Sequence, residues 1–162
     1  TIFYRYGEEK YSKSIARKIV EYRKNKKIET TLELVEIIKS GVPEKYKRET
    51  HPAKRCFQAI RIEVNKELEV FESALKDAID LLNKNGRICV ITFHSLEDRA
   101  VKNAMLEAKG RCTCPPDFPY CVCGAKSLGK IITRKPIVAT KLEQEENSRS
   151  KSAKLRIFER SE

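Results

Sequence analysis

The stretch ICVITFHSLED, residues 88–98, decides the fold class of this chain. Its first six residues form an almost unbroken apolar run of strand length, which is typical of a parallel strand buried on both faces of a sheet. The segment Ser95-Leu96-Glu97-Asp98 then forms a capping box, which predicts a helix that runs to about residue 107. A strand that is followed at once by a helix indicates an α/β layer.

His94 and Ser95 lie at the joint between this strand and its helix. Ligands of open α/β sheets gather outside the carboxyl ends of the strands, so His94 is a candidate to contact a substrate, move a proton or orient a base. The alternative is that His94 only caps the edge of the sheet while Ser95 begins the helix. A serine hydrolase is excluded, because residues 93–97 lack the glycines of a nucleophile elbow.

Upstream of the strand, the spacing of apolar residues predicts helices. Intervals of three and four predict one helix over residues 12–24 and a long one over residues 52–85, either continuous or broken near Asn65. A capping box starts a further helix at residues 30–33, and the polar residues 42–51 that follow it predict a loop.

Downstream of the strand, the sequence predicts two more strands and a long loop. Residues 131–133 and 153–158 predict the strands, and the alternation in the second is typical of a strand with one buried face. Residues 111–129 hold four Cys, three Pro and two Gly, which predicts a loop without regular structure.

The four cysteines of this loop form two Cys-x-Cys pairs: Cys112, Cys114, Cys121 and Cys123. Four thiolates within twelve positions can close tetrahedrally around zinc. Two disulfides, or a loop with uncoordinated thiols, are the alternatives. Disulfides are disfavoured because the sequence shows no secretory signal. Cys56 and Cys89 fall on apolar faces, so we interpret them as small core residues.

The chain is strongly basic, with 34 Lys and Arg against 23 Asp and Glu and a net charge of +11. Residues 1–66 hold 17 basic and nine acidic side chains, so the excess lies mainly there. This pattern indicates a polyanion such as nucleic acid as a partner, although a solvated helix face is an equal alternative. The candidate RNA-binding residues are Lys13, Arg17, Lys18, Lys24, Arg48, Arg55 and Arg61. No apolar run approaches the roughly 20 residues that span a membrane, so we expect no membrane partner.

The glycines do not form a cofactor loop. None of the six stands in a Gly-x-Gly pair, which excludes the usual nucleotide-binding loop within this sequence. The chain also begins at Thr1 without an initiator Met or a signal peptide, and we interpret it as part of a longer protein.

Several motifs together resemble one known family, the bacterial ribosomal RNA small subunit methyltransferase H family, also called MraW. They are, in order, Tyr6-Gly7-Glu8-Glu9, His51-Pro52-Ala53, the block of residues 57–68, Gly86-Arg87, the block of residues 93–99 and Ser152-Ala153-Lys154-Leu155-Arg156. The resemblance covers nearly the whole chain, and the blocks 57–68 and 93–99 are highly specific together.

The resemblance implies an enzyme that uses S-adenosylmethionine to methylate N4 of a cytidine in the decoding region of 16S rRNA. It implies a helix-rich α/β fold with two parts. Residues 1–66 would form an inserted helical domain that recognises substrate. Residues 67–162 would form the C-terminal portion of a class I, Rossmann-like methyltransferase sheet whose last strand is antiparallel, with the Cys-rich loop 111–129.

The resemblance also implies that the cofactor-binding residues precede Thr1, so this chain alone is expected to be inactive and none of its residues is assigned to the cofactor. The small ribosomal subunit would be the partner and the cytoplasm the location, and a homodimer is left open. The four-cysteine loop is not a defining motif of the family, so the resemblance adds nothing on zinc. The alternative function is a non-enzymatic, basic RNA-binding module with a zinc-stapled loop.

Overall fold

A single left-handed residue, Lys66, divides the long helical stretch after His51 into two helices. Helix α5 spans Pro52–Asn65, helix α6 spans Glu67–Asp80, and Lys66 has a φ of 52°. The computed structural model of the protein describes residues 1–49, 51–110, 112, 114, 115, 117–120 and 122–161. It divides near this break into two units, Thr1–Glu67 and Leu68–Glu162. The expected break near Asn65 is confirmed, whereas α6 ends before residue 85.

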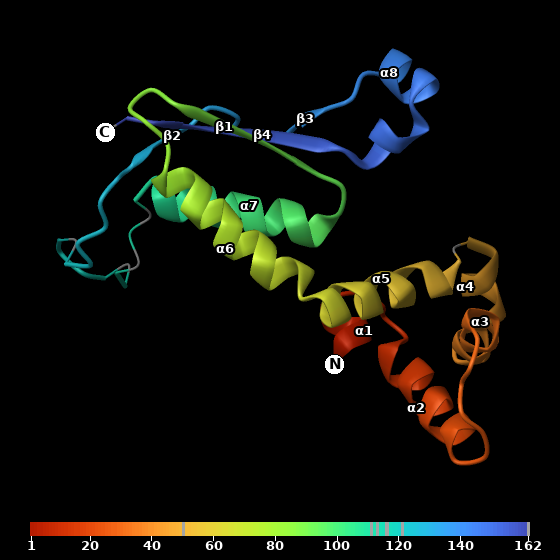
Figure 1. The fold of residues 1–162 in the computed structure, drawn as a ribbon. Coiled ribbons are helices and arrows are strands. Elements are labelled where there is room, and N and C mark those ends of the chain that lie inside the picture. Colours follow the sequence, from red (N-terminus) through yellow and green to blue (C-terminus); the bar gives the residue numbers. More distant parts are fainter. Residues whose placement is uncertain (50, 111, 113, 116, 121, 162) are drawn as a thin grey trace. The chain divides into compact units, whose positions relative to one another are not determined.

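The first unit is helical and packs around one apolar core. Besides α5 it contains α1 (Ile2–Arg5), α2 (Ser12–Arg23), α3 (Thr31–Ser40) and α4 (Glu44–Glu49) (Figure 1). Fully buried Ile15 of α2, Ile38 of α3 and Cys56 of α5 meet in this core. Part of the predicted loop 42–51 is in fact α4, because Tyr46 is buried against the same core and fixes a helical turn there.

The start of α3 follows its local sequence. The backbone N–H of Glu33 donates to the Thr30 hydroxyl over 3.1 Å, and the Glu33 carboxylate accepts in return from the backbone N–H of Thr30. The predicted capping box is therefore confirmed. At the other end, a Cβ on Gly41 would lie 2.9 Å from Cα of Ile15, so the absence of a side chain lets the chain pass close to α2.

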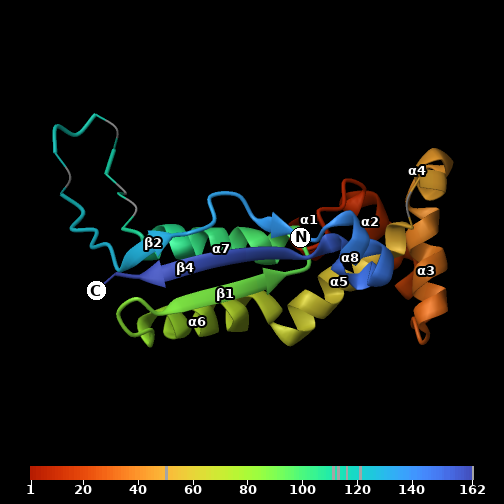
Figure 2. The same ribbon diagram turned by 90° about the horizontal axis from the view of Figure 1, so that it is seen from above.

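The second unit contains a small sheet whose last strand is central. The strands are β1 (Arg87–Thr92), β2 (Gly129–Ile131), β3 (Ile137–Val138) and β4 (Lys154–Arg160). Strand β4 lies between β1 and β2 and is antiparallel to β1, β2 and β3 (Figure 2). The expected antiparallel last strand is thus found, in a helix-rich α/β structure.

Two helices cover one face of this sheet. Helices α6 and α7 (Ser95–Ala108) lie side by side beneath the strands in Figures 1 and 2. Leu75 and Ile79 of α6, Val101 and Met105 of α7 and Phe158 of β4 form the core between them. Two short helices, α8 (Lys141–Glu146) and a 3-10 helix (Ser148–Ser152), precede β4. None of the helices in the described part of the chain is long and apolar enough to cross a membrane.

The other face of the sheet corrects two expectations about β1. The strand was expected to be parallel and buried on both faces, but it pairs antiparallel with β4 and its side chains alternate between the covered and the open face. Ile91 on the open face is 58% exposed, and Cys89 is exposed rather than a core residue. An apolar run shows that a strand avoids charge, but it does not show which face other elements cover.

Candidate functional site

His94, at the carboxyl end of β1, is the N-cap of α7. Its Nδ1 accepts a hydrogen bond from the backbone N–H of Glu97 over 3.3 Å. The Glu97 carboxylate accepts in return from the backbone N–H of His94 and from that of Phe93. The helix was expected to begin with a box of Ser95 and Asp98, so that expectation is wrong by one residue. The side chains of His94 and Glu97 thus accept the N–H of Glu97 in the first turn of α7 and the two amides just before the helix.

The second ring nitrogen of His94 has a different environment. Because Nδ1 accepts an N–H, the proton of the neutral imidazole lies on Nε2. This Nε2 is buried and has no hydrogen-bond partner among the described residues, although Glu97 Oε1 lies 3.2 Å away in poor geometry. The ring is 13% exposed. The cap fixes the orientation of the ring and leaves one donor unused, while contact with a substrate stays a prediction.

Asp98, next to this cap, fastens α7 to the central strand. Its carboxylate accepts two hydrogen bonds from the Arg156 guanidinium, of 2.7 and 3.1 Å, and lies 3.5 Å from Nζ of Lys154. The Arg156 guanidinium is the main reason that the pKa of Asp98 lies below its ordinary value. This planar, two-bond pair is largely shielded from water and holds the start of α7 against β4.

The predicted RNA-binding residues of α2 separate into two groups. Lys13, Arg17 and Lys24 are exposed and follow one another at intervals of four and seven, so they form a stripe on the helix face opposite buried Ile15. Lys18 lies off this stripe and donates to Glu21 over 2.9 Å. The charge of Lys18 is therefore partly compensated, and Nε of Arg17 lies 4.0 Å from the same Glu21 carboxylate.

Three further candidates lie on other helices of the same unit. Arg48 is exposed on α4. Arg55 of α5 donates to the backbone carbonyl of Glu8. Arg61 of α5 forms a two-bond ion pair with Glu67, at 2.7 and 3.1 Å, across the break at Lys66. Arg61 thus has a structural partner, whereas Arg48 and the α2 stripe keep the character expected of phosphate contacts.

A basic groove in the second unit was not among the predicted sites. It has a volume of about 460 Å³ and lies between α7 and the strands β2 and β4. Five of its lining residues are cationic: Lys102, Lys109, Lys130, Arg134 and Arg156. Lys130 pairs with Glu159 and Arg156 with Asp98, so Lys102, Lys109 and Arg134 mainly carry the basic character of the groove. The signal in the sequence was the spacing of seven between Lys102 and Lys109, which places both on one face of α7. Such a groove suits a phosphate backbone.

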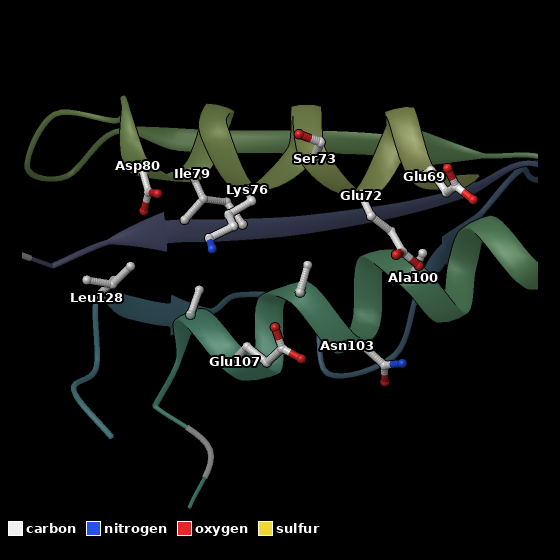
Figure 3. A pocket seen from close by; sticks show the side chains of 12 residues that line it. Glu69, Glu72, Ser73, Lys76, Ile79, Asp80, Ala100, Asn103, Glu107 and Leu128 are labelled. Carbon is white, nitrogen blue, oxygen red and sulfur yellow. The ribbon is translucent and has the colours of Figure 1, made fainter. Parts of the chain in front are cut away.

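The larger cavity of this unit has the opposite charge. It has a volume of about 780 Å³ and lies between α6 and α7 (Figure 3). Glu69, Glu72, Asp80 and Glu107 line it, with Lys76 as the one cation among its lining residues. This cavity repels polyanions, so its size does not make it the RNA site.

The cysteines fall into three environments. Cys56 is buried in the first unit, as expected, and burial raises its pKa to about 12, so it stays a neutral thiol. Cys89 is exposed on β1. In the loop, the Sγ atoms of Cys112, Cys114 and Cys123 all lie within 4.8 Å of one another. Cys121, the fourth predicted ligand, lies outside the described residues.

Comparison with known proteins gives consistent matches. A family model described as the MraW methylase family matches residues 1–161. A protein of Clostridium botulinum (strain Loch Maree / Type A3) named "Ribosomal RNA small subunit methyltransferase H" is 61% identical over 96% of this chain and 50% of its own length. A protein of Lachnospira eligens with the same name is 59% identical over 96% of the chain and 50% of its own length. "Ribosomal RNA small subunit methyltransferase H 2" of Agathobacter rectalis is 58% identical over 97% of the chain. The chain spans about half the length of the curated relatives it matches.

Proposed function

We propose, because the chain belongs to the MraW methylase family, that the whole protein transfers a methyl group from S-adenosylmethionine to ribosomal RNA. The observation that carries this proposal is the 61% identity, over 96% of the chain, to a protein named for methylation of small-subunit rRNA. The target that we propose is N4 of a cytidine in the decoding region of 16S rRNA, within the small ribosomal subunit, and the location is the cytoplasm.

We assign different tasks to the two units. The helical unit would recognise RNA through the α2 stripe of Lys13, Arg17 and Lys24, together with Arg48 and Arg55. The sheet unit would be the C-terminal portion of a Rossmann-like methyltransferase domain. Its basic groove offers the RNA a second contact surface, and the charges that line it support this part of the proposal.

His94 is our candidate for the substrate side of the reaction. The exocyclic amine of cytosine is a weak nucleophile, so its alignment with the methyl group must be held closely. The ring lies at the carboxyl end of a strand, where ligands of α/β sheets gather, and a local movement that exposes its buried Nε2–H would let it hold a base by a hydrogen bond. In this role His94 positions the base and exchanges no proton.

S-adenosylmethionine supplies the methyl group, but the residues of this chain do not fit a cofactor site. The N–H of Glu97 in the first turn of α7, and the amides of Phe93 and His94 just before it, already donate to the side chains of His94 and Glu97, so these three offer no donor to a cofactor. The chain also has no Gly-x-Gly pair. We therefore expect that this chain alone does not bind S-adenosylmethionine. A calorimetric titration that finds one site at micromolar affinity would contradict this.

A chimera tests the proposed reaction. This chain would replace the matching half of the Clostridium botulinum relative, which at 61% identity should accept it. Small subunits from a strain that lacks its own enzyme would then be incubated with the chimera and S-adenosylmethionine, and the rRNA nucleosides analysed by mass spectrometry. We expect N4-methylcytidine at one position. Methylation of another base, or of a ribosomal protein, would reject the proposed target.

The same chimera separates the second candidate function. The α2 stripe and the basic groove also fit an RNA-binding module without enzymatic activity. A chimera that folds, binds S-adenosylmethionine and binds rRNA, yet transfers no methyl group, would favour that module.

A further inference from the structure

The cysteine cluster of the loop between α7 and β2 has the spacing of a metal site. Two sulfurs that are each about 2.3 Å from a tetrahedral zinc ion lie about 3.8 Å from each other. The Sγ atoms of Cys112 and Cys123 lie 3.8 Å apart, and all three described Sγ atoms lie within 4.8 Å of one another. Cys112 and Cys123 are eleven residues apart in the sequence, and the loop brings their sulfurs together.

Backbone amides point at the same sulfurs. The N–H of Cys114 donates to Sγ of Cys112 over 3.4 Å, and the N–H of Val122 donates to Sγ of Cys114 over 3.3 Å. Hydrogen bonds of this kind orient the ligands of metal sites and stabilise the charge of a thiolate. The Cys112 and Cys123 sulfurs are far beyond the roughly 2.05 Å of a disulfide bond, so these two cysteines are not joined to each other.

The loop has little else to hold it in one conformation. Between Cys112 and Leu128 the described residues form no helix or strand, and Phe118, Tyr120 and Val122 are 50%, 76% and 64% exposed. Its base is fixed where the N–H of Leu128 donates to the carbonyl of Ala108 over 2.8 Å. Ordering a loop costs conformational entropy, and the described residues between Cys112 and Leu128 form no apolar core that would offset this cost.

We propose that Cys112, Cys114 and Cys123 bind one zinc ion, which orders the loop. Soft thiolate ligands select zinc over magnesium or calcium, and zinc binding can supply the free energy that orders a small unit without a core. The fourth position of the tetrahedron falls to a further donor, such as a water molecule. This site is independent of the proposed methyl transfer.

Metal analysis of the purified protein tests the proposal without RNA or cofactor. The chain would be purified under reducing conditions without chelators and analysed for metals by mass spectrometry. We expect about one zinc per chain. Replacement by cobalt should give the strong thiolate-to-metal charge-transfer absorption of a tetrahedral sulfur site. Protein that contains less than a tenth of an equivalent of zinc and takes up none on addition, or that contains iron instead, would overturn the proposal.

Single substitutions identify the ligands. Cys112→Ser, Cys114→Ser and Cys123→Ser should each weaken zinc binding at least tenfold in competition with a chromophoric chelator. Cys89→Ser is the matched control, because it removes an exposed thiol from β1, outside the loop, and should retain the zinc. Unchanged zinc affinity in all three loop variants would overturn the assignment.

Hydrogen exchange of the unmodified chain decides the question even where a variant fails to fold. Zinc should slow exchange of the amides between residues 112 and 128, and removal of zinc by a chelator should restore it. The exchange of β1 should stay the same in both states. A loop that exchanges equally fast with and without zinc would contradict the proposed ordering.

Discussion

His94 has one observed role and one proposed role. As the N-cap of α7 it holds the start of that helix, and its place two residues after β1 is where we propose that it meets a substrate. The two roles use different atoms, because Nδ1 serves the cap and Nε2 has no partner among the described residues. Substitutions can therefore separate them.

We expect His94→Ala to lower the free energy of unfolding by about 1 kcal/mol, because the Glu97 N–H loses its acceptor. His94→Asn should restore most of this stability, since the Asn side chain is a good N-cap. Urea denaturation of the chain measures both effects.

Methyl transfer by the chimera distinguishes the substrate role. If His94 holds the base, the Asn variant should be stable but should transfer methyl groups at least tenfold more slowly than the unmodified chimera. A stable His94→Asn variant with full activity would show that His94 only caps α7 and does not hold the base.

Capping explains why the helices were predictable and where the prediction went wrong. The Thr30 and Glu33 box is local, so four residues of sequence were enough to place the start of α3. At α7 the sequence analysis named the box of Ser95 and Asp98, whereas the structure has a box of His94 and Glu97, one residue earlier. Asp98 was unavailable because Arg156, 58 residues away, holds its carboxylate, and a sequence pattern does not show such a contact.

The sequence predicted where the main strands of the sheet lie, but not which face of the sheet is covered by helices. The positions of β1 and β4 and the antiparallel last strand followed from pattern and resemblance, whereas the exposure of Cys89 and Ile91 depends on which helices cover the sheet. The basic groove was missed for the same reason. Its cations come from α7, β2, the turn after β2 and β4, and only the fold brings them together.

The start of α3 should respond to acid. The Lys26 ammonium and the backbone amides of Glu29 and Thr30 lower the pKa of Glu33 from an ordinary 4.5 to about 2. Its stabilising contribution is therefore complete above pH 4.5 and is lost as the pH falls towards 2. A Glu33→Gln variant, which keeps the cap geometry without the charge, should melt below the unmodified chain at pH 6, and the gap should narrow by pH 2.

Thermal melts of both proteins across this pH range check the prediction. Glu36→Gln is the control, because it removes an exposed carboxylate of the same helix that pairs with Lys39 outside the cap. A gap between the Glu33→Gln variant and the unmodified chain that is constant with pH would show that the Glu33 charge does not stabilise α3.

Gly129 controls the pairing of β2 with β4. A Cβ at this position would lie 2.1 Å from the backbone oxygen of Glu159 and 2.9 Å from Cζ of Phe158. We expect Gly129→Ala to lower the free energy of unfolding by about 3 kcal/mol, because backbone atoms must move. Lys130→Ala, on the exposed side of the same strand, should cost at most about 1 kcal/mol. Equal effects of the two changes in urea denaturation would contradict this view.

Charge is distributed unevenly over the whole molecule. Basic residues are in excess mainly in the first 66 residues, while in the second unit a basic groove and an acidic cavity use different surfaces of α7. RNA should therefore bind to the α2 stripe and the basic groove rather than to the whole surface of the protein.

The salt dependence of RNA binding measures these contacts. Each neutralised phosphate of a single strand contributes about 0.7 to the slope of log affinity against log salt. Replacing both Lys13 and Lys24 by Ala should weaken binding to any RNA sequence and reduce the slope by about 1.4. Filter binding at several salt concentrations gives both values.

Lys39→Ala with Lys47→Ala is the matched control, because it removes two lysines of the same unit that already pair with Glu36 and Glu44. This control should change the slope by much less. If both double variants behave alike, the α2 stripe is only a solvated surface.

The central position of β4 determines the order in which the sheet unit can form during synthesis. Thr92 pairs with Lys154, and Arg87 pairs with Glu159. Each residue of β1 is therefore synthesised 62 to 72 residues before its partner in β4. At roughly 5–20 residues per second this delay lasts several seconds. Helices α6 and α7 can form in that time, but among the described residues Ile88 and Val90 gain a neighbouring strand only when β4 is made. We therefore expect the edge of β1 that pairs with β4 to stay open during these seconds, whereas the helical unit can already be complete.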